Sequence, residues 1–278
     1  MSDGVLARGA QQHLKLFRAS LPLRLKLQEI ARGLGPLQDQ VCLDIGAATG
    51  ATSHHLRRLG GKWDTVATDE RAAANLREVV PENVYVFEGP ALPFKKKSFD
   101  AVVIVDALER IAEDDQFIEE CHKILKPDGK LVVCVAHAKR WSLLRLLRRM
   151  LGLTHEKMGQ VRPGYSESEL FSILKHGFDL QGVRSYARFF LEITDVFVRF
   201  SEGRLQTRPD GGEGRLRLLH AVARPVYWLA YQLDMLLLFT RGHRLVAVAK
   251  RRAWRPRVTP VLVDGRSITE AVLSRAID

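Results

Sequence analysis

The sequence predicts an α/β fold: a doubly wound, mostly parallel sheet of seven strands with helices on both faces. Short apolar runs that indicate buried strands alternate with segments of helical periodicity, and this alternation is typical of a parallel sheet covered on both sides. The chain has 278 residues, of which 46% are hydrophobic and 27% are charged. Such a composition excludes disordered, collagen-like and disulfide-scaffold proteins.

The first half of the chain supplies most of the expected sheet. Apolar runs predict five strands, at 41–45, 63–68, 84–87, 101–105 and 130–136. Helical spacing predicts four helices, at 22–33, 52–59, 71–79 and 113–125. In the first helix, Leu23, Leu27 and Ile30 share one side, which we expect to be the buried one.

The second half begins with a basic amphipathic helix at 141–151, in which Arg145, Arg148 and Arg149 lie opposite leucines. A further helix is expected at 167–176. Two last strands are expected at 183–188 and 244–250, and the helices at 189–200 and 215–239 fill the interval between them. The sequence therefore predicts a helical insertion before the last strand.

The charge is unevenly distributed along the chain. The net charge is +11, and it divides into +3 for residues 1–40, −4 for 41–137 and +12 for 138–278. A basic half beside a mildly acidic core favours an anionic partner, although a solvated basic surface explains the whole half equally well and any single arginine better.

Cysteine usage indicates a reducing compartment. The three cysteines, Cys42, Cys121 and Cys134, lie in apolar segments and lack metal-ligand spacing, so we expect buried thiols and no metal site. The first residues contain no apolar core with a cleavage site, so we expect no signal peptide and a cytoplasmic protein.

The motif with most chemical content follows the first predicted strand. Asp44 and Gly46 begin a turn that continues through Ala48 to Gly50. Glycine lets a backbone approach a ligand closely, and ligands of open α/β sheets bind beyond the carboxyl ends of the strands. A dinucleotide loop has the spacing G-x-G-x-x-G, which this turn fits poorly, so a nicotinamide-dependent dehydrogenase is disfavoured. Asp69 ends the second strand, where a carboxylate can accept both hydrogens of a ribose diol.

Several further stretches, in order, resemble the class I S-adenosylmethionine-dependent methyltransferases of the type 11 group, which have a Rossmann-like fold. Asp44–Gly50 resembles their motif Asp-x-Gly-x-Gly-x-Gly, with Ala48 in place of the middle glycine. The other matching stretches are Glu88–Phe94, Ser98–Asp100, Leu108–Arg110, Leu125–Gly129 and Tyr165–Leu170. The family usually has histidine where this chain has Arg110.

The resemblance implies S-adenosylmethionine as the cofactor and a set of residues that hold it. Asp69 corresponds to the acidic residue that binds the ribose, Glu88 to the residue that contacts the adenine amino group, and Gly89 would place a backbone N–H near the ring. The whole implied cofactor-binding set is Asp44, Gly46, Ala48, Gly50, Asp69, Glu88, Gly89 and Asp106.

Methyl transfer needs an acceptor held in line, exclusion of water and, for some acceptors, a base. Asp106, Glu109 and His137 follow the fourth and fifth strands, where a base would lie. His137 is the candidate catalytic residue, because imidazole titrates near neutral pH, although a histidine that only orients the chain as it leaves the strand is the commoner case. Arg162 and Tyr165 are expected to line the acceptor pocket.

The resemblance divides the chain into four parts. Residues 1–37 form an N-terminal helical segment, and 38–188 with 243–251 form the methyltransferase domain. Residues 189–242 form an apolar helical insertion, either an acceptor lid or a membrane contact, and 252–278 form a basic tail.

The acceptor class follows from the insertion and the charge. Residues 226–239 are dominated by apolar side chains but contain Asp234, and the run is too short to span a bilayer. Together with the basic helix it favours a lipid-linked or apolar acceptor and peripheral contact with the inner face of an anionic membrane. Two alternatives remain open: an RNA-directed methyltransferase, and a non-catalytic module that binds S-adenosylmethionine.

Overall fold

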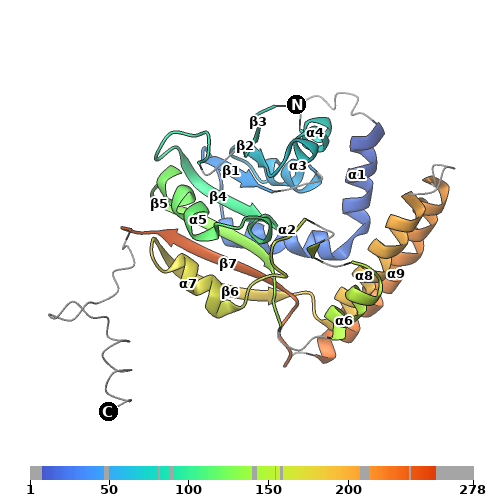
Figure 1. Cartoon of the computed structure of the whole chain (residues 1–278). Helices are drawn as coiled ribbons and strands as arrows, with labels where there is room; N and C mark the ends of the chain where they lie inside the picture. Colours follow the sequence, from blue (N-terminus) through green and yellow to red (C-terminus); the bar gives the residue numbers. More distant parts are fainter. Residues whose placement is uncertain are drawn as a thin grey trace, which may run out of the picture.

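Helices on two sides enclose a single central sheet in this computed structural model (Figure 1). The structure describes residues 8–46, 50–80, 82–87, 91–139, 143–153, 155–156, 159–206, 213–237 and 239–254. The strands are β1 (Val41–Ile45), β2 (Lys62–Ala67), β3 (Val84–Val86), β4 (Phe99–Val105), β5 (Leu125–Ala136), β6 (Phe178–Tyr186) and β7 (Arg244–Arg251). The helices are α1 (Arg8–Ala19), α2 (Leu21–Leu34), α3 (Ala51–Arg57), α4 (Glu70–Val79), η1 (Leu108–Arg110), α5 (Asp114–Ile124), α6 (Leu143–Met150), α7 (Glu167–Leu174), α8 (Phe189–Gln206) and α9 (Glu213–Leu236).

The strands follow the order β3-β2-β1-β4-β5-β7-β6. Neighbouring strands from β3 to β5 pair in parallel, whereas β7 is antiparallel to both β5 and β6. The order reverses between β1 and β4, which is the point where open α/β sheets bind ligands. The predicted seven-stranded, mostly parallel sheet is thus confirmed in outline, with β7 as the strand that makes it mixed.

Alternating residues of β4 serve the two faces of the sheet. Val102 and Ile104 belong to the core on one face, which contains residues of α5 and α7. Ala101, Val103 and Val105 belong to the core on the other face, together with residues of α2 and α3. Because both faces are covered, β4 is apolar almost throughout, which explains why an unbroken apolar run marked it in the sequence.

Helices α8 and α9 lie between β6 and β7 in the chain and form an antiparallel pair beside α1 and α6 (Figure 1). Asp234 of α9 joins the two helices: its carboxylate accepts hydrogen bonds from the backbone N–H groups of Phe190 and Leu191, at 2.8 and 3.3 Å. The acidic residue in the apolar run therefore caps the first turn of α8, whose N–H groups have no partner within the helix.

Candidate functional site

Two cavities lie along the carboxyl edge of the sheet. The small cavity, of about 450 Å³, is bordered by Thr68 and Asp69 after β2 and by Phe87 after β3. The large cavity, of about 1270 Å³, is bordered by Gly46 after β1, by the turn after β4 and by side chains of α1, α2, α6, α8 and α9. Arg110 lines both cavities, so they adjoin at the end of β4.

Gly46 lines the large cavity at the end of β1, with a φ of 92°. A Cβ at this position would lie 2.3 Å from the Cβ of Ala107 and 2.7 Å from the carbonyl oxygen of Val105. Both the positive φ and the close approach of the next strand require glycine here. Gly46 thus borders the large cavity and is tightly packed against the end of β4.

Asp44 is fully buried and lines neither cavity. Its two carboxylate oxygens accept hydrogen bonds from the hydroxyls of Ser53 and Thr65, and Arg57 lies 4.0 Å away. Burial raises the pKa of Asp44, while Arg57 and the two hydroxyls oppose that shift. In this structure Asp44 joins β1, β2 and α3 beneath the turn, and its side chain faces protein groups only among the described residues.

Asp69 lines the small cavity and also caps α4. Its Oδ1 accepts a hydrogen bond from the backbone N–H of Ala72 at 2.7 Å. Since a carboxylate has about four acceptor positions, the cap leaves capacity for a ligand hydroxyl pair.

Asp106 lines the large cavity directly after β4 and has a φ of 49°. Its carboxylate forms an ion pair with Lys26 of α2, and Arg244 of β7 lies 3.6 Å away. Burial alone would raise the pKa of Asp106, but the positive charges of Lys26 and Arg244 together outweigh burial and lower the pKa to about 2. Asp106 therefore stays negatively charged near neutral pH and lies in the wall of the large cavity, at the carboxyl end of β4.

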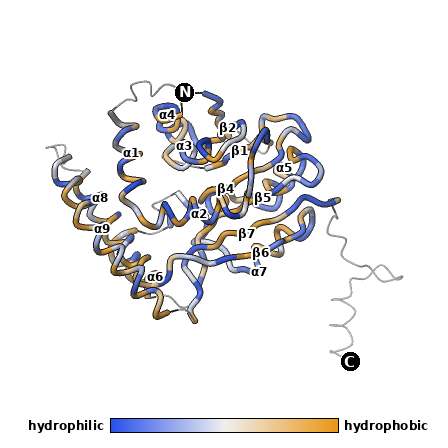
Figure 2. The backbone as a smooth tube through the Cα atoms, turned by 180° about the vertical axis from the view of Figure 1, so that it is seen from behind, coloured by the Kyte–Doolittle hydropathy of each residue, from blue (hydrophilic) through white to orange (hydrophobic). Residues whose placement is uncertain are grey.

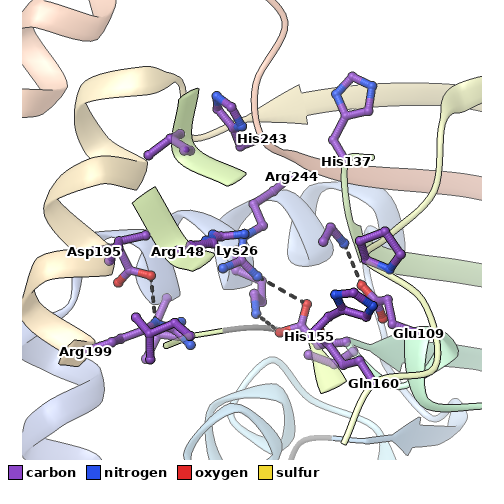
Figure 3. A pocket seen from close by; sticks show the side chains of 18 of the residues that line it. Lys26, Glu109, His137, Arg148, His155, Gln160, Asp195, Arg199, His243 and Arg244 are labelled. Carbon is purple, nitrogen blue, oxygen red and sulfur yellow. Dashed lines mark hydrogen bonds and ion pairs between the residues drawn. The ribbon is translucent and has the colours of Figure 1, made fainter. Parts of the chain in front are cut away.

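Further charged groups extend this arrangement toward the helical pair (Figure 3). Glu192 of α8 is fully buried and bonded to Arg148 of α6, with Arg244 at 3.2 Å. Burial would raise the pKa of Glu192, yet Arg244 and Arg148 lower it to about 2. These ion pairs connect α6, α8 and β7, so the wall of the large cavity depends on contacts between distant parts of the chain.

His137 also lines the large cavity, one residue after β5. Its Nδ1 donates a hydrogen bond to the carbonyl oxygen of Gly242 at 2.8 Å, and its backbone N–H donates to the carbonyl oxygen of His243 at 2.9 Å. Figure 3 shows the His137 ring directed away from Lys26 and Glu109.

The sequence predicts Arg162 and Tyr165 at the acceptor pocket, and the structure places both side chains beside Asp114. The Tyr165 hydroxyl is buried and donates to Asp114 at 2.8 Å, and Arg162 forms an ion pair with the same carboxylate. Neither side chain borders the large cavity. Both side chains hold the segment before α7 against the turn after β4. Three other residues of that segment border the cavity, namely Gln160, Pro163 and Ser166.

Of the predicted cofactor residues, the structure brings Gly46, Asp69 and Asp106 to the cavity walls. Gly50 is buried at the start of α3 with a φ of 68°. Ala48, Glu88 and Gly89 lie outside the described residues.

Sequence reasoning missed Lys26, Glu192 and Arg244. A signal existed for Lys26, since the buried residues of α2 are Pro22, Lys26, Ile30 and Leu34, spaced four apart. A lysine within an otherwise apolar stripe indicates a buried charge that needs a partner. No local pattern predicts that the partner is Asp106, which lies 80 residues further along the chain.

Comparison with known proteins agrees with this geometry. Residues 43–133 match the family model described as a methyltransferase domain. The chain is 31% identical over 112 residues to a demethylmenaquinone methyltransferase of Tropheryma whipplei, and the match covers 39% of this chain and 47% of that protein. The chain thus spans about half the length of this relative. A homologue with the same name from Mycobacterium sp. strain KMS is 35% identical over 107 residues, which cover 37% of this chain and 44% of that protein.

Solved structures show the same fold at low identity. The cyclase SpnF has a TM-score of 0.56 and 16% identity, covering 83% of this chain and 80% of its own. The cyclopropane synthase MmaA2 of Mycobacterium tuberculosis has a TM-score of 0.55 and 18% identity, covering 83% and 84%. The family match identifies a methyltransferase domain over residues 43–133, and it implies S-adenosylmethionine as the cofactor.

The residues of the site fit that cofactor. Gly46, directly after β1, leaves no room for a side chain. Asp69 in the small cavity has acceptor positions left that suit the hydroxyl pair of a ribose. In the described ranges, no group of three or more histidine, cysteine or acidic side chains is placed to hold a metal ion. Nor does any helix in the described part of the chain have the length and apolar character needed to cross a membrane.

Proposed function

We propose that this protein transfers a methyl group from S-adenosylmethionine to an amphipathic acceptor that has an ionisable ring or head group and an apolar tail. The observation that carries the proposal is the large cavity, which adjoins the cofactor edge and is lined by two kinds of side chain. Charged groups gather near the ends of β4 and β7, among them Lys26, Asp106 and Arg244. Such a cavity matches a molecule that is polar at one end only.

The apolar part of the lining comes from helices outside the sheet. Leu16 and Phe17 of α1, Leu144 of α6, Val196 of α8 and Tyr227 of α9 border the large cavity. Of these, Leu144, Val196 and Tyr227 are each about 2% exposed, so this part of the cavity wall is tightly packed. An apolar tail along this wall would be removed from water, which contributes roughly 25 cal/mol per Å² of buried apolar surface.

The names of the relatives support the same acceptor class. Relatives that match 39% and 44% of this chain are demethylmenaquinone methyltransferases, and a quinol with a prenyl tail is such an amphipathic acceptor. We therefore take a demethylmenaquinol with a short prenyl tail as the first probe.

The bound cofactor supplies an electrophilic methyl group. The chain contributes orientation and a dry, shaped cavity, which account for much of the rate when two reactants are held in line. Asp69 accepts hydrogen bonds from the ribose, and Gly46 lets the backbone approach the ligand. Asp106 stays ionised and offers a carboxylate to a cationic or hydrogen-bond-donating group.

We propose in addition that the protein works at an anionic membrane surface. Helix α6 exposes Leu143, Leu146 and Met150 on one side, with exposed fractions of 74%, 58% and 77%. Arg145 and Arg149 lie on an adjacent side of α6 and line the large cavity. An exposed apolar stripe bordered by arginines is typical of a helix that lies in a membrane interface.

Helix α9 has a second exposed apolar stripe. Its inner side packs through Leu216, Ala223, Tyr227 and Ala230, all at most 5% exposed. Its outer side exposes Leu218, Val222, Val226, Leu229 and Leu236, which recur at helical spacing. Figure 2 shows hydrophobic stretches along α6 and α9 at the same end of the molecule. A lipid surface at this end would deliver an apolar acceptor directly to the rim of the large cavity.

Turnover is the first test. We expect purified protein, labelled S-adenosylmethionine and reduced short-chain demethylmenaquinone to give a product with one added methyl group. Incubation with separated lipid, small-molecule and RNA fractions extends the search. Product only in the RNA fraction would contradict the amphipathic acceptor, and cofactor binding without product in any fraction would favour a non-catalytic module.

Vesicle co-sedimentation tests the membrane surface separately. We expect binding to vesicles that contain anionic phospholipid, weaker binding to neutral vesicles, and loss of the difference as salt screens the charges. Equal partitioning to both vesicle types, or none, would contradict the surface proposal and leave the methyltransferase proposal standing.

A further inference from the structure

Glu109 places a buried, half-satisfied carboxyl group in the wall of the large cavity. It lies in the η1 turn after β4 and is 1% exposed. Its Oε1 accepts a hydrogen bond from the backbone N–H of Ala136 at 2.6 Å, whereas Oε2 has no hydrogen-bond partner among the described residues. Figure 3 shows the side chain among those that line the cavity.

An unpaired oxygen on a buried carboxyl group destabilises a fold, so native proteins seldom keep one without a use. The carboxyl group borders the cavity that also contains Gly46 and Asp106, at the cofactor edge of the sheet. Oε2 is the oxygen that the described residues leave without a partner beside this cavity, while the hydrogen bond from Ala136 to Oε1 fixes the orientation of the group.

The pKa values of Asp106 and Glu109, which are three residues apart, shift in opposite directions. Burial, followed by the neighbouring charge of Asp106, raises the pKa of Glu109 to about 7, although the Ala136 N–H and Arg244 oppose this shift. Asp106 keeps a pKa of about 2. Near neutral pH, Asp106 is thus a permanent charge and Glu109 can gain or lose a proton, which is the usual division of roles between paired carboxyl groups in enzymes.

Other titratable or charged groups face Glu109 from the elements packed around it. They are Asp106 on the same turn, Arg244 of β7, Cys134 of β5 and Tyr165 before α7, and the cavity wall adds Lys26, His137 and His155. Lys26 and Arg244 are both engaged with Asp106, and burial raises the pKa of Cys134 to about 12 and that of Tyr165 further, so neither exchanges a proton near pH 7.

We propose that Glu109 is the general base that accepts the proton released by the acceptor, an inference that rests on the proposed function. The acceptor's X–H bond breaks, and its proton forms a bond to Oε2 of Glu109. The electron pair left on X forms the new bond to the methyl carbon, while the electrons of the carbon–sulfur bond return to sulfur. The proton on Glu109 then passes to solvent after the product leaves.

His137 is the other candidate for the base, and the position of its ring suits that role less well than the position of Glu109 does. Its Nδ1 is bonded to the Gly242 carbonyl oxygen, and its ring is directed away from Glu109 in Figure 3. This arrangement joins the end of β5 to the segment before β7. We assign His137 to holding the chain there.

The decisive variant is Glu109→Gln, because the amide oxygen of glutamine can still accept the hydrogen bond from Ala136. We expect the variant to bind S-adenosylhomocysteine within about 2-fold of wild type and to lose about 10²- to 10⁴-fold in the single-turnover rate with the demethylmenaquinol probe. In wild type the rate should fall below about pH 7, and this acidic limb should be absent in Glu109→Gln. Glu119→Gln, an exposed residue of α5 paired with Lys123, is the matched control and should behave as wild type.

A Glu109→Gln rate within about 3-fold of wild type, with the acidic limb intact, would overturn the proposal. If the variant does not fold, the wild-type profile decides, and a rate independent of pH between about 5 and 8 overturns it. If wild type binds S-adenosylhomocysteine but yields no product, the proposed function fails separately. Infrared difference spectra of wild type then still test Glu109, since a carboxyl group that does not titrate near pH 7 also overturns the proposal.

Discussion

Lys26 of α2 and Asp106, the residue that follows β4, form an ion pair at the edge of the large cavity although 80 residues separate them in the chain. The lysine side chain is 6% exposed and the aspartate side chain 32%. The pair attaches the N-terminal helices to the end of β4. Part of the cavity wall is therefore built by residues that precede the methyltransferase family match.

Replacing this lysine tests how much the attachment contributes. In Lys26→Met, Asp106 would lose its ion-pair partner and keep Arg244 at 3.6 Å, so its carboxylate would be partly uncompensated. We expect the free energy of unfolding to fall by about 2 kcal/mol at pH 7, measured by urea denaturation, and the pKa of Asp106 to rise. Lys15→Met, on an exposed position of α1, should change stability by less than about 0.5 kcal/mol. Equal stability of the two variants would contradict a structural role for the pair.

The raised pKa of Glu109 has a consequence for stability that needs no substrate. The native state keeps this proton up to about pH 7, whereas the ordinary value is 4.5, so the unfolded state loses the proton first as pH rises. Stability should therefore fall between about pH 4.5 and about pH 7, by up to about 3 kcal/mol. Glu109→Gln removes this contribution, so its melting temperature should exceed that of wild type at pH 8 and lose this advantage toward pH 4.5. A difference that is the same at both pH values would show that Glu109 has an ordinary pKa.

Gly46 has no room for even one methyl group. We expect Gly46→Ala to destabilise the protein by about 2–3 kcal/mol and to weaken S-adenosylhomocysteine binding, because the new Cβ would collide with the Ala107 side chain and the Val105 carbonyl oxygen. Gly203→Ala is the matched control, since no atom lies within 4 Å of its added Cβ and alanine favours the helical interior of α8. Thermal denaturation and calorimetric titration measure both effects. Wild-type stability in Gly46→Ala would mean that the turn is looser than the structure has it.

Two arginines of α6, Arg145 and Arg149, allow a quantitative test of the membrane proposal. We expect the double variant Arg145→Gln, Arg149→Gln to bind anionic vesicles about 10- to 30-fold more weakly, because each arginine near such a surface contributes about 1 kcal/mol. The control is Arg58→Gln, Arg71→Gln, two exposed arginines at α3 and α4, on the other side of the molecule from α6 (Figure 1). Equal loss in both double variants would indicate non-specific attraction by net charge.

Much of the fold was predictable because its strands are buried on both faces. Short apolar runs marked β1, β4 and the later part of β5, and Gly46 and Asp106 follow β1 and β4 at one edge of the sheet. Residues 126–129 lie between the predicted helix at 113–125 and the predicted strand at 130–136, and the structure makes them part of β5, where the pairing shifts from Phe99–Leu125 to Ala101–Lys130. Turn residues there form an irregularity within a strand, which local sequence does not distinguish from a strand end.

The wall of the large cavity was less predictable, since it depends on pairs that are distant in the sequence. Leu23 and Leu27 were expected on the buried side of α2 together with Ile30, yet the fully buried stripe is Pro22, Lys26, Ile30 and Leu34. Asp234 interrupts the apolar run at 226–239 in the sequence, and in the structure it caps α8. In both cases a buried charge marked an important position, but only the three-dimensional structure identified its partner.

Cofactor binding tests the central claim most directly. We expect calorimetric titration to show one S-adenosylhomocysteine bound per chain, with a Kd in the micromolar range, and Asp69→Asn to weaken it about 10-fold or more while keeping the cap on α4. Glu70→Gln, an exposed neighbour paired with Arg77, should bind as wild type does. No detectable binding of S-adenosylhomocysteine to the folded wild-type protein at about 1 mM would contradict the assignment of these cavities to the cofactor.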